Sequence, residues 1–250
     1  MPLVNFKITV EYDGSGFHGW QRQKACRTVQ GEIEKALETL SGQKIAVIGS
    51  GRTDAGVHAL GQVAGFKCRT RLGPAVLQKA LNSLLPAAIV IHDCQAAGPN
   101  FHARFDVRRK TYRYRILNRP LAVAVGRQYA WHIRRPLDLE TLRRAAAILV
   151  GRHDFAAFEG AGSPRAHSVR QVFTALWRLE DDTGFLAFDI EADGFLRFMV
   201  RNIVGTLVLV GAGKIGIADF KDILQSRERQ RAGATAPPQG LFLISVSYRL

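Results

Sequence analysis

The segment best suited to chemistry is residues 49–59, which read GSGRTDAGVHA. Its glycines allow backbone turns that other residues disfavour. The turn presents one carboxylate, Asp54, with Arg52 two residues earlier. The pattern G-x-x-x-x-G-K-[ST] of a phosphate-binding loop is absent, so the candidate reactive group is the carboxylate. The alternative is an aspartate that only closes a tight turn through its own backbone.

A second candidate segment is strongly basic. Residues 104–119 hold seven Lys and Arg side chains against the single acid Asp106. Within it, Lys110, Arg113 and Arg115 are interleaved with tyrosines at positions 112 and 114. Cations at this density suit phosphate binding, and tyrosine rings can stack on bases. The alternative is a solvated charged face of a strand.

The composition of the whole chain agrees with a polyanionic partner. The 250 residues include 35 Lys and Arg and 21 Asp and Glu, which gives a formal net charge of +14. So strong a positive charge concentrates phosphate-bearing partners, although an anionic membrane surface is an alternative. A hydrophobic content of 47% is enough for a buried core and excludes wholesale disorder.

Metal, disulfide and membrane signals are weak. The three cysteines are odd in number and show no C-x-x-C spacing, and the histidines show no H-E-x-x-H pattern. We therefore expect no metal and a reducing, cytoplasmic location. The longest apolar stretch, around residues 203–213, is shorter than the roughly 18 residues that a membrane span requires. The N-terminus also lacks the pattern of a signal peptide, so we expect no membrane association.

The elements that must position these residues follow from periodicity. In the first half, alternation predicts a strand over residues 6–12, and helical spacing predicts a helix over 29–40 with Thr28 as its N-cap. Short apolar runs predict further strands, and Pro74 opens a second helix. The resulting order is β-α-β-β-α-β. The strands in question are residues 45–48, 62–68 and 89–94.

The second half repeats this order without detectable residue identity. We expect a strand over 107–117, in which Tyr112 and Tyr114 share one face, and a helix capped by Asp138. The later elements are strands at 173–179, 186–190 and 241–248 and helices at 195–210 and 217–224. The predicted fold is α+β: two ferredoxin-like or RRM-like halves with antiparallel sheets, helices packed on one face and a catalytic cleft between the halves. The predicted domains are residues 1–103 and 104–250.

Five ordered motifs together resemble the tRNA pseudouridine synthase A family over most of the chain. The first is the glycine-rich segment at residues 51–59, whose aspartate is the catalytic nucleophile in that family. The others are residues 12–21, 101–104 with 110–114, 193–197 with 199–205, and 236–238 with 240–241. One departure is visible: the family often has an acid before the isoleucine at position 89, whereas this chain has Ala88.

The resemblance implies an activity, a substrate and site residues. It implies isomerisation of uridine to pseudouridine at tRNA positions 38, 39 and 40, a flipped base, a homodimer and no cofactor. It implies that Asp54 is the nucleophile, that Arg201 keeps this carboxylate ionised and that Tyr112 is the active-site tyrosine. Tyr114, on the same face, is expected to be structural. We favour an RNA contact for Arg52 over a role as the ionic partner of Asp54.

Several alternatives stay open. The carboxylate serves the reaction either by adding to the nucleotide or by stabilising positive charge that develops at C1′. A non-catalytic RNA-binding module also fits paired β-α-β-β-α-β halves with a basic, tyrosine-bearing strand. A hydrolase would use a second carboxylate to activate water, and residues 49–59 contain none besides Asp54.

Overall fold

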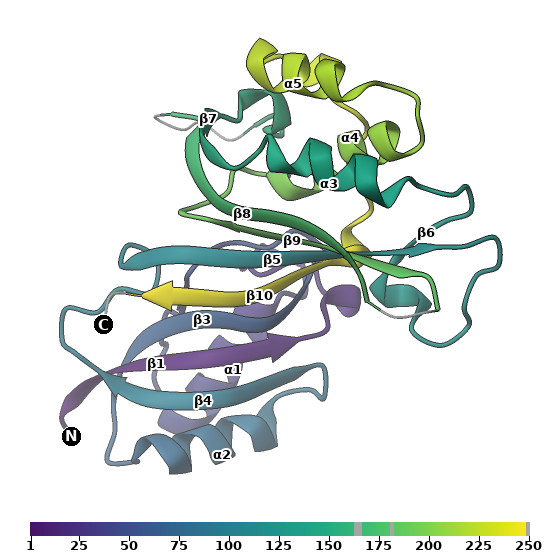
Figure 1. Cartoon of the computed structure of the whole chain (residues 1–250). Coiled ribbons are helices and arrows are strands. Elements are labelled where there is room, and N and C mark those ends of the chain that lie inside the picture. The colour runs from purple at the N-terminus through teal and green to yellow at the C-terminus, as the bar shows by residue number, and fades with distance from the viewer. Residues whose placement is uncertain (163–166, 181–182, 249–250) are drawn as a thin grey trace. The chain divides into compact units, whose positions relative to one another are not determined.

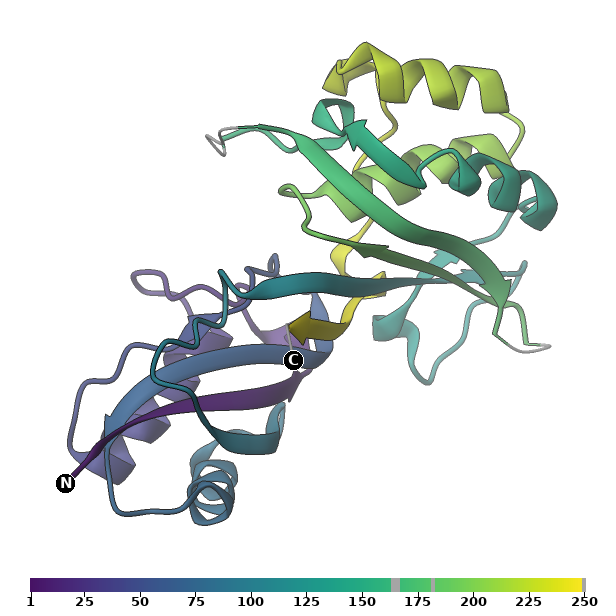
Figure 2. The same cartoon turned by 60° about the vertical axis from the view of Figure 1, so that its left-hand side comes forward.

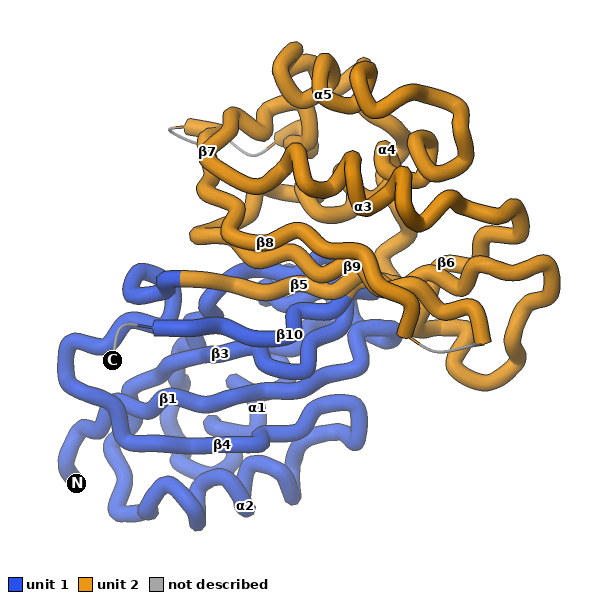
Figure 3. The backbone as a smooth tube through the Cα atoms, in the orientation of Figure 1, with its two compact units in different colours: residues 1–108, 242–250 blue, residues 109–241 orange. Residues whose placement is uncertain are grey.

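The computed structural model describes residues 1–162, 167–180 and 183–248. By backbone proximity these residues form two compact units (Figure 3). Unit 1 comprises residues 1–108 and 242–250, and unit 2 comprises residues 109–241. These units place the last strand with the first half of the chain, whereas the predicted domain at 104–250 placed it with the second. The division into domains at residues 1–103 and 104–250 stays a prediction.

Unit 1 has the predicted β-α-β-β-α-β order. Its elements are β1 (Leu3–Tyr12), η1 (Gly14–Gly16), α1 (Val29–Ser41), β2 (Ile48–Gly49), β3 (His58–Arg69), α2 (Pro74–Leu84) and β4 (Ile89–Ala97). Strand β1 pairs antiparallel with both β3 and β4. Helices α1 and α2 lie on one face of these strands (Figure 1). The predicted strand at residues 45–48 is wrong in extent, because only Ile48 and Gly49 pair with β3.

The chain returns to unit 1 at its end. Strand β10 (Leu241–Tyr248) pairs in parallel with β3, with Phe242 opposite His58 and Leu243 opposite Ala59. This pairing explains why residues 242–250 belong to unit 1. A second parallel pairing lies in unit 2, between residues 116–118 and 131–133. The pairings of β1 with β3 and β4, and of β2 with β3, are antiparallel, as predicted.

Unit 2 carries the second set of strands. They are β5 (Val107–Asn118), β6 (Trp131–Ile133), β7 (Gly151–Asp154), β8 (Val169–Leu179) and β9 (Phe185–Ala192), in the sheet order β5-β9-β8-β7 with β6 beside β5. Helices α3 (Leu139–Ala147), α4 (Met199–Gly211) and α5 (Ile217–Ser226) lie on one side of β8 and β9 (Figure 2). The predicted α+β class and the arrangement of helices on one face are confirmed.

Helix α4 begins later than its apolar pattern predicts. The expected start was Phe195, but the helix starts at Met199 because Phe198 adopts a left-handed conformation with φ 60°. Non-glycine residues rarely adopt this conformation, and it turns the chain before the first helical residue. Arg197 therefore lies in the turn before the helix, and Arg201 lies in the first helical turn.

Helix α4 is also packed against a distant segment of unit 2. The Asn202 amide donates to the carbonyl of Phe158, and the hydroxyl of Thr235 donates to Asn202 Oδ1 at 2.6 Å. A Cβ at Gly205 would lie 1.8 Å from the carbonyl oxygen of Ala234. Only glycine permits this approach, so the helix and residues 233–236 are in direct backbone contact.

Replacing Gly205 with alanine should therefore destabilise unit 2. The added methyl group has to displace a backbone carbonyl, which costs about 2–4 kcal/mol when the structure relaxes only partly. Urea unfolding of Gly205→Ala should show this loss. Gly194→Ala is a matched control, since its Cβ would meet Arg170 Nε at an ordinary 3.5 Å. Equal stability of the two variants would contradict the close packing of α4.

Candidate active site

The loop that carries Asp54 joins β2 to β3 in unit 1. Thr53 is buried and Asp54 is half-buried, so the carboxylate lies at the border between protein and solvent. The amide of Val57 donates to the carbonyl of Asp54 at 3.2 Å, and Gly56 has φ +76°. The loop is thus a closed turn, which agrees with the glycine spacing in the sequence.

A second segment, residues 13–20, packs along this loop. The Trp20 amide donates to the carbonyl of Thr53 at 3.1 Å. The hydroxyls of Tyr12 and Thr53 lie 2.8 Å apart. Burial raises the pKa of Tyr12 to about 12, although hydrogen bonds to Thr53 and Gln62 oppose the increase. The phenol therefore keeps its proton at neutral pH, and the residue before Asp54 is held on both its backbone and its side chain.

Two glycines make this packing possible. Gly19 has φ +84°, and a Cβ there would lie 2.4 Å from the carbonyl oxygen of Thr53. A Cβ at Gly14 would lie 2.1 Å from the carbonyl oxygen of Val57. Both distances exclude a side chain, so the backbone on each side of Asp54 is in contact with glycine backbone. These glycines belong to the motif at residues 12–21, which the sequence singles out only by resemblance.

His58 also supports the loop, a role that was not predicted from the sequence. Its side chain is buried, and its Nδ1 accepts a hydrogen bond from the amide of Gly14 at 3.0 Å. The same Nδ1 lies 3.1 Å from Asp13 Oδ1. The ring stacks on Phe242 of β10 with centroids 4.7 Å apart. Spacing alone gave no signal for this role, because the partners come from opposite ends of the chain.

Arg52 differs from its neighbours in being exposed. Its Nε donates to Gln21 Oε1 at 3.1 Å, which directs the side chain along the segment that precedes α1. Its guanidinium is accessible for a solvent-borne ligand. The predicted contact between Arg52 and RNA fits this exposure and stays a prediction.

Unit 2 holds the two tyrosines on β5. Tyr112 is 7% exposed, pairs in register with Ile190 and meets Phe195 edge to face at 4.9 Å. Tyr114 is fully buried, and its hydroxyl donates to the carbonyl of Pro237 at 2.7 Å. Burial holds the pKa of Tyr114 well above its usual value, while the charge of Arg201 acts in the opposite direction. This burial agrees with the expectation that Tyr114 is structural, which stays a prediction.

Arg201 is fixed on α4 by a segment near the end of unit 2. Its Nε donates to the carbonyl of Ala236 at 2.7 Å, and the amide of Ala236 donates to the Arg201 carbonyl at 3.1 Å. The guanidinium also lies 5.1 Å from the centre of the Phe198 ring. Half-buried and held in this way, Arg201 is a positioned cation, whereas a surface arginine would be free to rotate.

The other predicted RNA-binding residues of β5 differ in their surroundings. Arg113 forms a two-pronged ion pair with Asp189, at 2.7 and 3.0 Å, and this carboxylate raises the pKa of the arginine. Arg115 donates to Glu180 at 2.8 Å. Lys110 is half-buried and lies opposite Ala192 in the strand register. The carboxylates offset much of the charge that Arg113 and Arg115 bring to this face.

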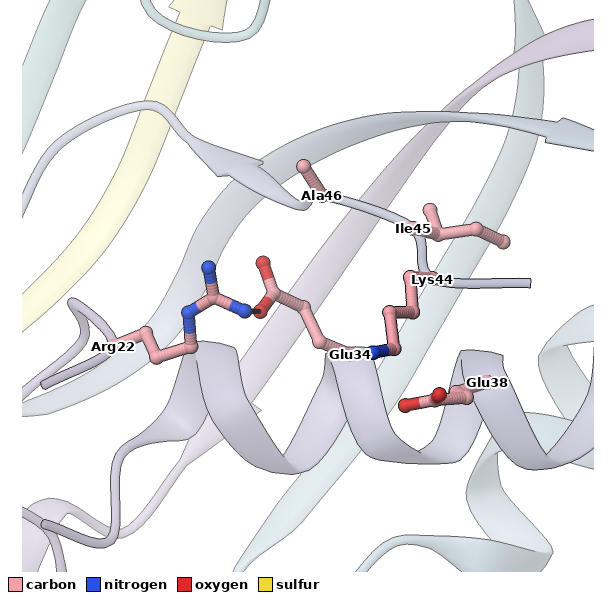
Figure 4. Close-up of a pocket in the computed structure, with 6 residues that line it drawn as sticks. All are labelled: Arg22, Glu34, Glu38, Lys44, Ile45 and Ala46. Carbon is pink, nitrogen blue, oxygen red and sulfur yellow. Dashed lines mark ion pairs between the residues drawn. The ribbon is translucent and has the colours of Figure 1, made fainter. Parts of the chain in front are cut away.

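A pocket lies elsewhere in unit 1. It holds about 350 Å³ beside α1 and the segment before β2 (Figure 4). An ion pair at 3.0 Å between Arg22 and Glu34 crosses it. The lining residues are Arg22, Glu34, Glu38, Lys44, Ile45 and Ala46. None of them is a predicted site residue, so the pocket does not mark the candidate chemistry.

No group of three or more His, Cys, Asp or Glu side chains among the described residues is arranged to hold a metal ion. Among the same residues, no helix has the length and apolar character needed to span a membrane.

Comparison with known proteins identifies the family. A family model described as tRNA pseudouridine synthase matches residues 8–106 and 145–249. The chain is 47% identical over 246 residues to tRNA pseudouridine synthase A of Thermoanaerobacter sp. (strain X514), covering 98% of this chain and 100% of the relative. It is also 47% identical over 250 residues to tRNA pseudouridine synthase A of Moorella thermoacetica, covering 99% and 100%.

A third relative agrees. The protein named tRNA pseudouridine synthase A in Acetivibrio thermocellus is 46% identical over 246 residues, with 98% of this chain and 100% of the relative aligned. The matched regions contain the Asp54 loop, the first turn of α4 and the end of the chain. The chain therefore belongs to the tRNA pseudouridine synthase family.

Proposed function

We propose that this protein isomerises uridine to pseudouridine in the anticodon stem-loop of tRNA, at positions 38, 39 and 40. Family membership and full-length relatives named tRNA pseudouridine synthase A support a tRNA-acting isomerase. The observation that carries the residue assignment is the braced loop around Asp54. A half-buried carboxylate on a turn fixed by two glycine contacts suits a group that has to meet a substrate atom in one orientation.

The reaction breaks the bond between N1 of uracil and C1′, turns the base and joins C5 to C1′. We assign Asp54 to the nucleotide, where its carboxylate either adds covalently or stabilises positive charge at C1′. The base has to leave its stack to be reached, which costs a few kcal/mol and is easiest near a loop. Arg52 is exposed and lies two residues before Asp54 in the sequence. We propose that it holds the RNA while the base is out of its stack.

Tyr112 and Arg201 complete the proposed site. The Tyr112 ring would stack on the uracil, and its oxygen, as the phenolate, would accept the proton that leaves C5. Arg201 would offset the desolvation that a covering base imposes on Asp54, because a nearby cation favours the ionised carboxylate. Its fixed geometry on Ala236 supports this role. These steps change no oxidation state, so we propose that the enzyme uses no cofactor.

We propose that the protein acts in the cytoplasm as a homodimer. All three cysteines are free thiols, which suits a reducing compartment. Each protomer carries a formal charge of +14, and two protomers would present a doubled positive field to one tRNA. The predicted cleft between the two halves of the chain is part of this proposal.

Asp54→Asn should abolish the reaction. The amide keeps the shape of the side chain but supplies neither the nucleophile nor the negative charge, so the rate should fall by about 10³-fold or more. The measurement is release of tritium from bulk tRNA labelled at uracil C5, with tRNA binding measured in parallel. Asp93→Asn on β4 is the matched control and should release tritium normally. Activity retained by Asp54→Asn would show that the nucleophile is misassigned.

Arg201 should show a graded response. Lysine keeps the charge but loses the Nε donor to Ala236, so Arg201→Lys should retain partial activity. Arg201→Gln removes the charge and should be nearly inactive, with a larger fall in kcat than in tRNA affinity. Urea unfolding of both variants separates lost activity from lost folding. If the glutamine and lysine variants were equally active, the charge would not serve the reaction.

Lys110 and Arg113 should differ in their effect on salt dependence. Lys110→Gln should lower the slope of log affinity for tRNA against log salt by about one, as expected for one lost phosphate contact. Arg113→Gln should change the slope less, because Asp189 already occupies two guanidinium donors. Filter binding at several salt concentrations measures both slopes. An unchanged slope for Lys110→Gln would identify a solvated lysine.

A further inference from the structure

A second basic feature lies next to the Asp54 loop in unit 1. Residues 21–27, which we call the basic loop, read QRQKACR and carry three cations and no acid. The loop connects Trp20 to Thr28, the N-cap of α1. The functions assigned above use none of its cations.

The basic loop is closed at its base by hydrogen bonds. The amide of His18 donates to the carbonyl of Arg27 at 2.9 Å, and the amide of Gln30 donates to the carbonyl of Trp20 at 3.0 Å. The backbone amide of Arg22 donates to Gln30 Oε1 at 2.9 Å, which holds this residue beside α1. These bonds join the Arg27 end of the loop to His18 and the Trp20 end to Gln30 of α1, so both ends of the loop are held in place.

The tip contains a residue in an unfavourable conformation. Ala25 has φ 61°, a left-handed value that costs a non-glycine residue about 1–2 kcal/mol. A bridge between Gln23 and Cys26 closes the turn around it. Lys24, the residue before Ala25 at the tip, is exposed to solvent. Strain at a turn of this kind is commonly retained where the turn has a binding role.

The two arginine side chains of the loop form ion pairs and remain exposed to solvent. Arg22 pairs with Glu34 at 3.0 Å and Arg27 pairs with Glu32 at 2.7 Å, both glutamates being on α1. The guanidinium of Arg27 also lies 4.8 Å from the centre of the Phe17 ring. The arginine side chains remain 68% and 52% exposed. Each pair orients a guanidinium while leaving other donors accessible, so less entropy is lost when an anion binds.

The basic loop is tied directly to the Asp54 loop. Gln21 accepts a hydrogen bond from Arg52 Nε at 3.1 Å, and the neighbouring Trp20 amide donates to the carbonyl of Thr53. Gln21 of the basic loop and Trp20, the residue before the loop, therefore contact the two residues that precede Asp54. An anion bound by the basic loop would lie close to the nucleotide that Asp54 meets.

We propose that the basic loop binds the phosphodiester backbone of the RNA next to the uridine that is isomerised. The proposal rests on the proposed function and adds a binding site to it. Three oriented cations on a solvent-facing turn fit consecutive phosphates of one strand. When a nucleotide leaves its stack, the backbone phosphates next to it come close to the protein surface that holds the base.

The first experiment compares two lysines. Lys24→Gln should lower the salt slope of tRNA binding by about 0.9 and weaken binding about fivefold near 0.15 M salt, the effect of one phosphate contact. Lys35→Gln is the matched control, since Lys35 is exposed on α1 outside the loop, and it should leave both quantities unchanged. At saturating tRNA, kcat of Lys24→Gln should equal that of the unchanged protein.

The outcomes of this comparison are distinct. A slope for Lys24→Gln equal to that of Lys35→Gln would overturn the proposal, as would a loss of kcat with unchanged affinity. Failure of the proposed isomerase function would show separately, as absence of tritium release by the unchanged protein. The salt slopes are still measurable in that case, because they report binding alone.

The second experiment uses a native thiol. Cys26 in the basic loop is half-exposed, whereas Cys68 and Cys94 are buried and serve as internal references. Bound tRNA should slow alkylation of Cys26 by iodoacetamide at least severalfold and leave the two reference thiols unchanged. The Lys24→Gln variant should need more tRNA for the same protection. Full reactivity of Cys26 at saturating tRNA would overturn the proposal without any mutation.

Discussion

The backbone contact between residues 13–20 and the Asp54 loop is the constraint on which the candidate site in unit 1 depends. A reactive carboxylate needs a fixed position, and loops rarely provide one without help. Here Gly14 and Gly19 bring one backbone against another at distances that leave no space for a side chain. His58 accepts a hydrogen bond from the amide of Gly14. The hydroxyl of Tyr12 is hydrogen-bonded to that of Thr53, so both side chains support the same contact. The position of Asp54 is thus set by main-chain geometry, and the neighbouring basic loop shares that support.

In unit 2, hydrogen bonds to residue 236 position a cation, the guanidinium of Arg201. The Arg201 guanidinium is bonded to a carbonyl of residue 236, and the same residue returns a bond to the arginine backbone. Asn202 and Gly205 hold the next turns of α4 against residues 233–235. A few residues further along, the chain enters β10, where Phe242 stacks on His58 in unit 1. One continuous segment therefore supports Arg201 at its start and the Asp54 loop at its end.

The sequence predicted the class of fold and most elements, because periodicity and caps are local signals. Thr28 and Asp138 cap α1 and α3 as expected. The late start of α4 was missed, since nothing local marks Phe198 as left-handed. The return of β10 beside β3 was missed because strand pairing over such a separation leaves no periodic trace. For the site, the glycines around Asp54 were visible, whereas the bracing by His58 and the ion pairs of Arg113 and Arg115 depend on contacts between strands.

The place of β10 has a consequence for biosynthesis. Strand β3 is made early, but its parallel neighbour comes from residues that are made much later, at positions 242 and 243. Pairings between segments so distant in sequence form slowly, because loop closure has to precede any gain from contacts. Until these residues are made, β3 lacks its parallel neighbour β10 and the His58 ring lacks the Phe242 ring that stacks on it. The nascent chain should therefore complete unit 1 only once the residues of β10, Leu241–Tyr248, have been made.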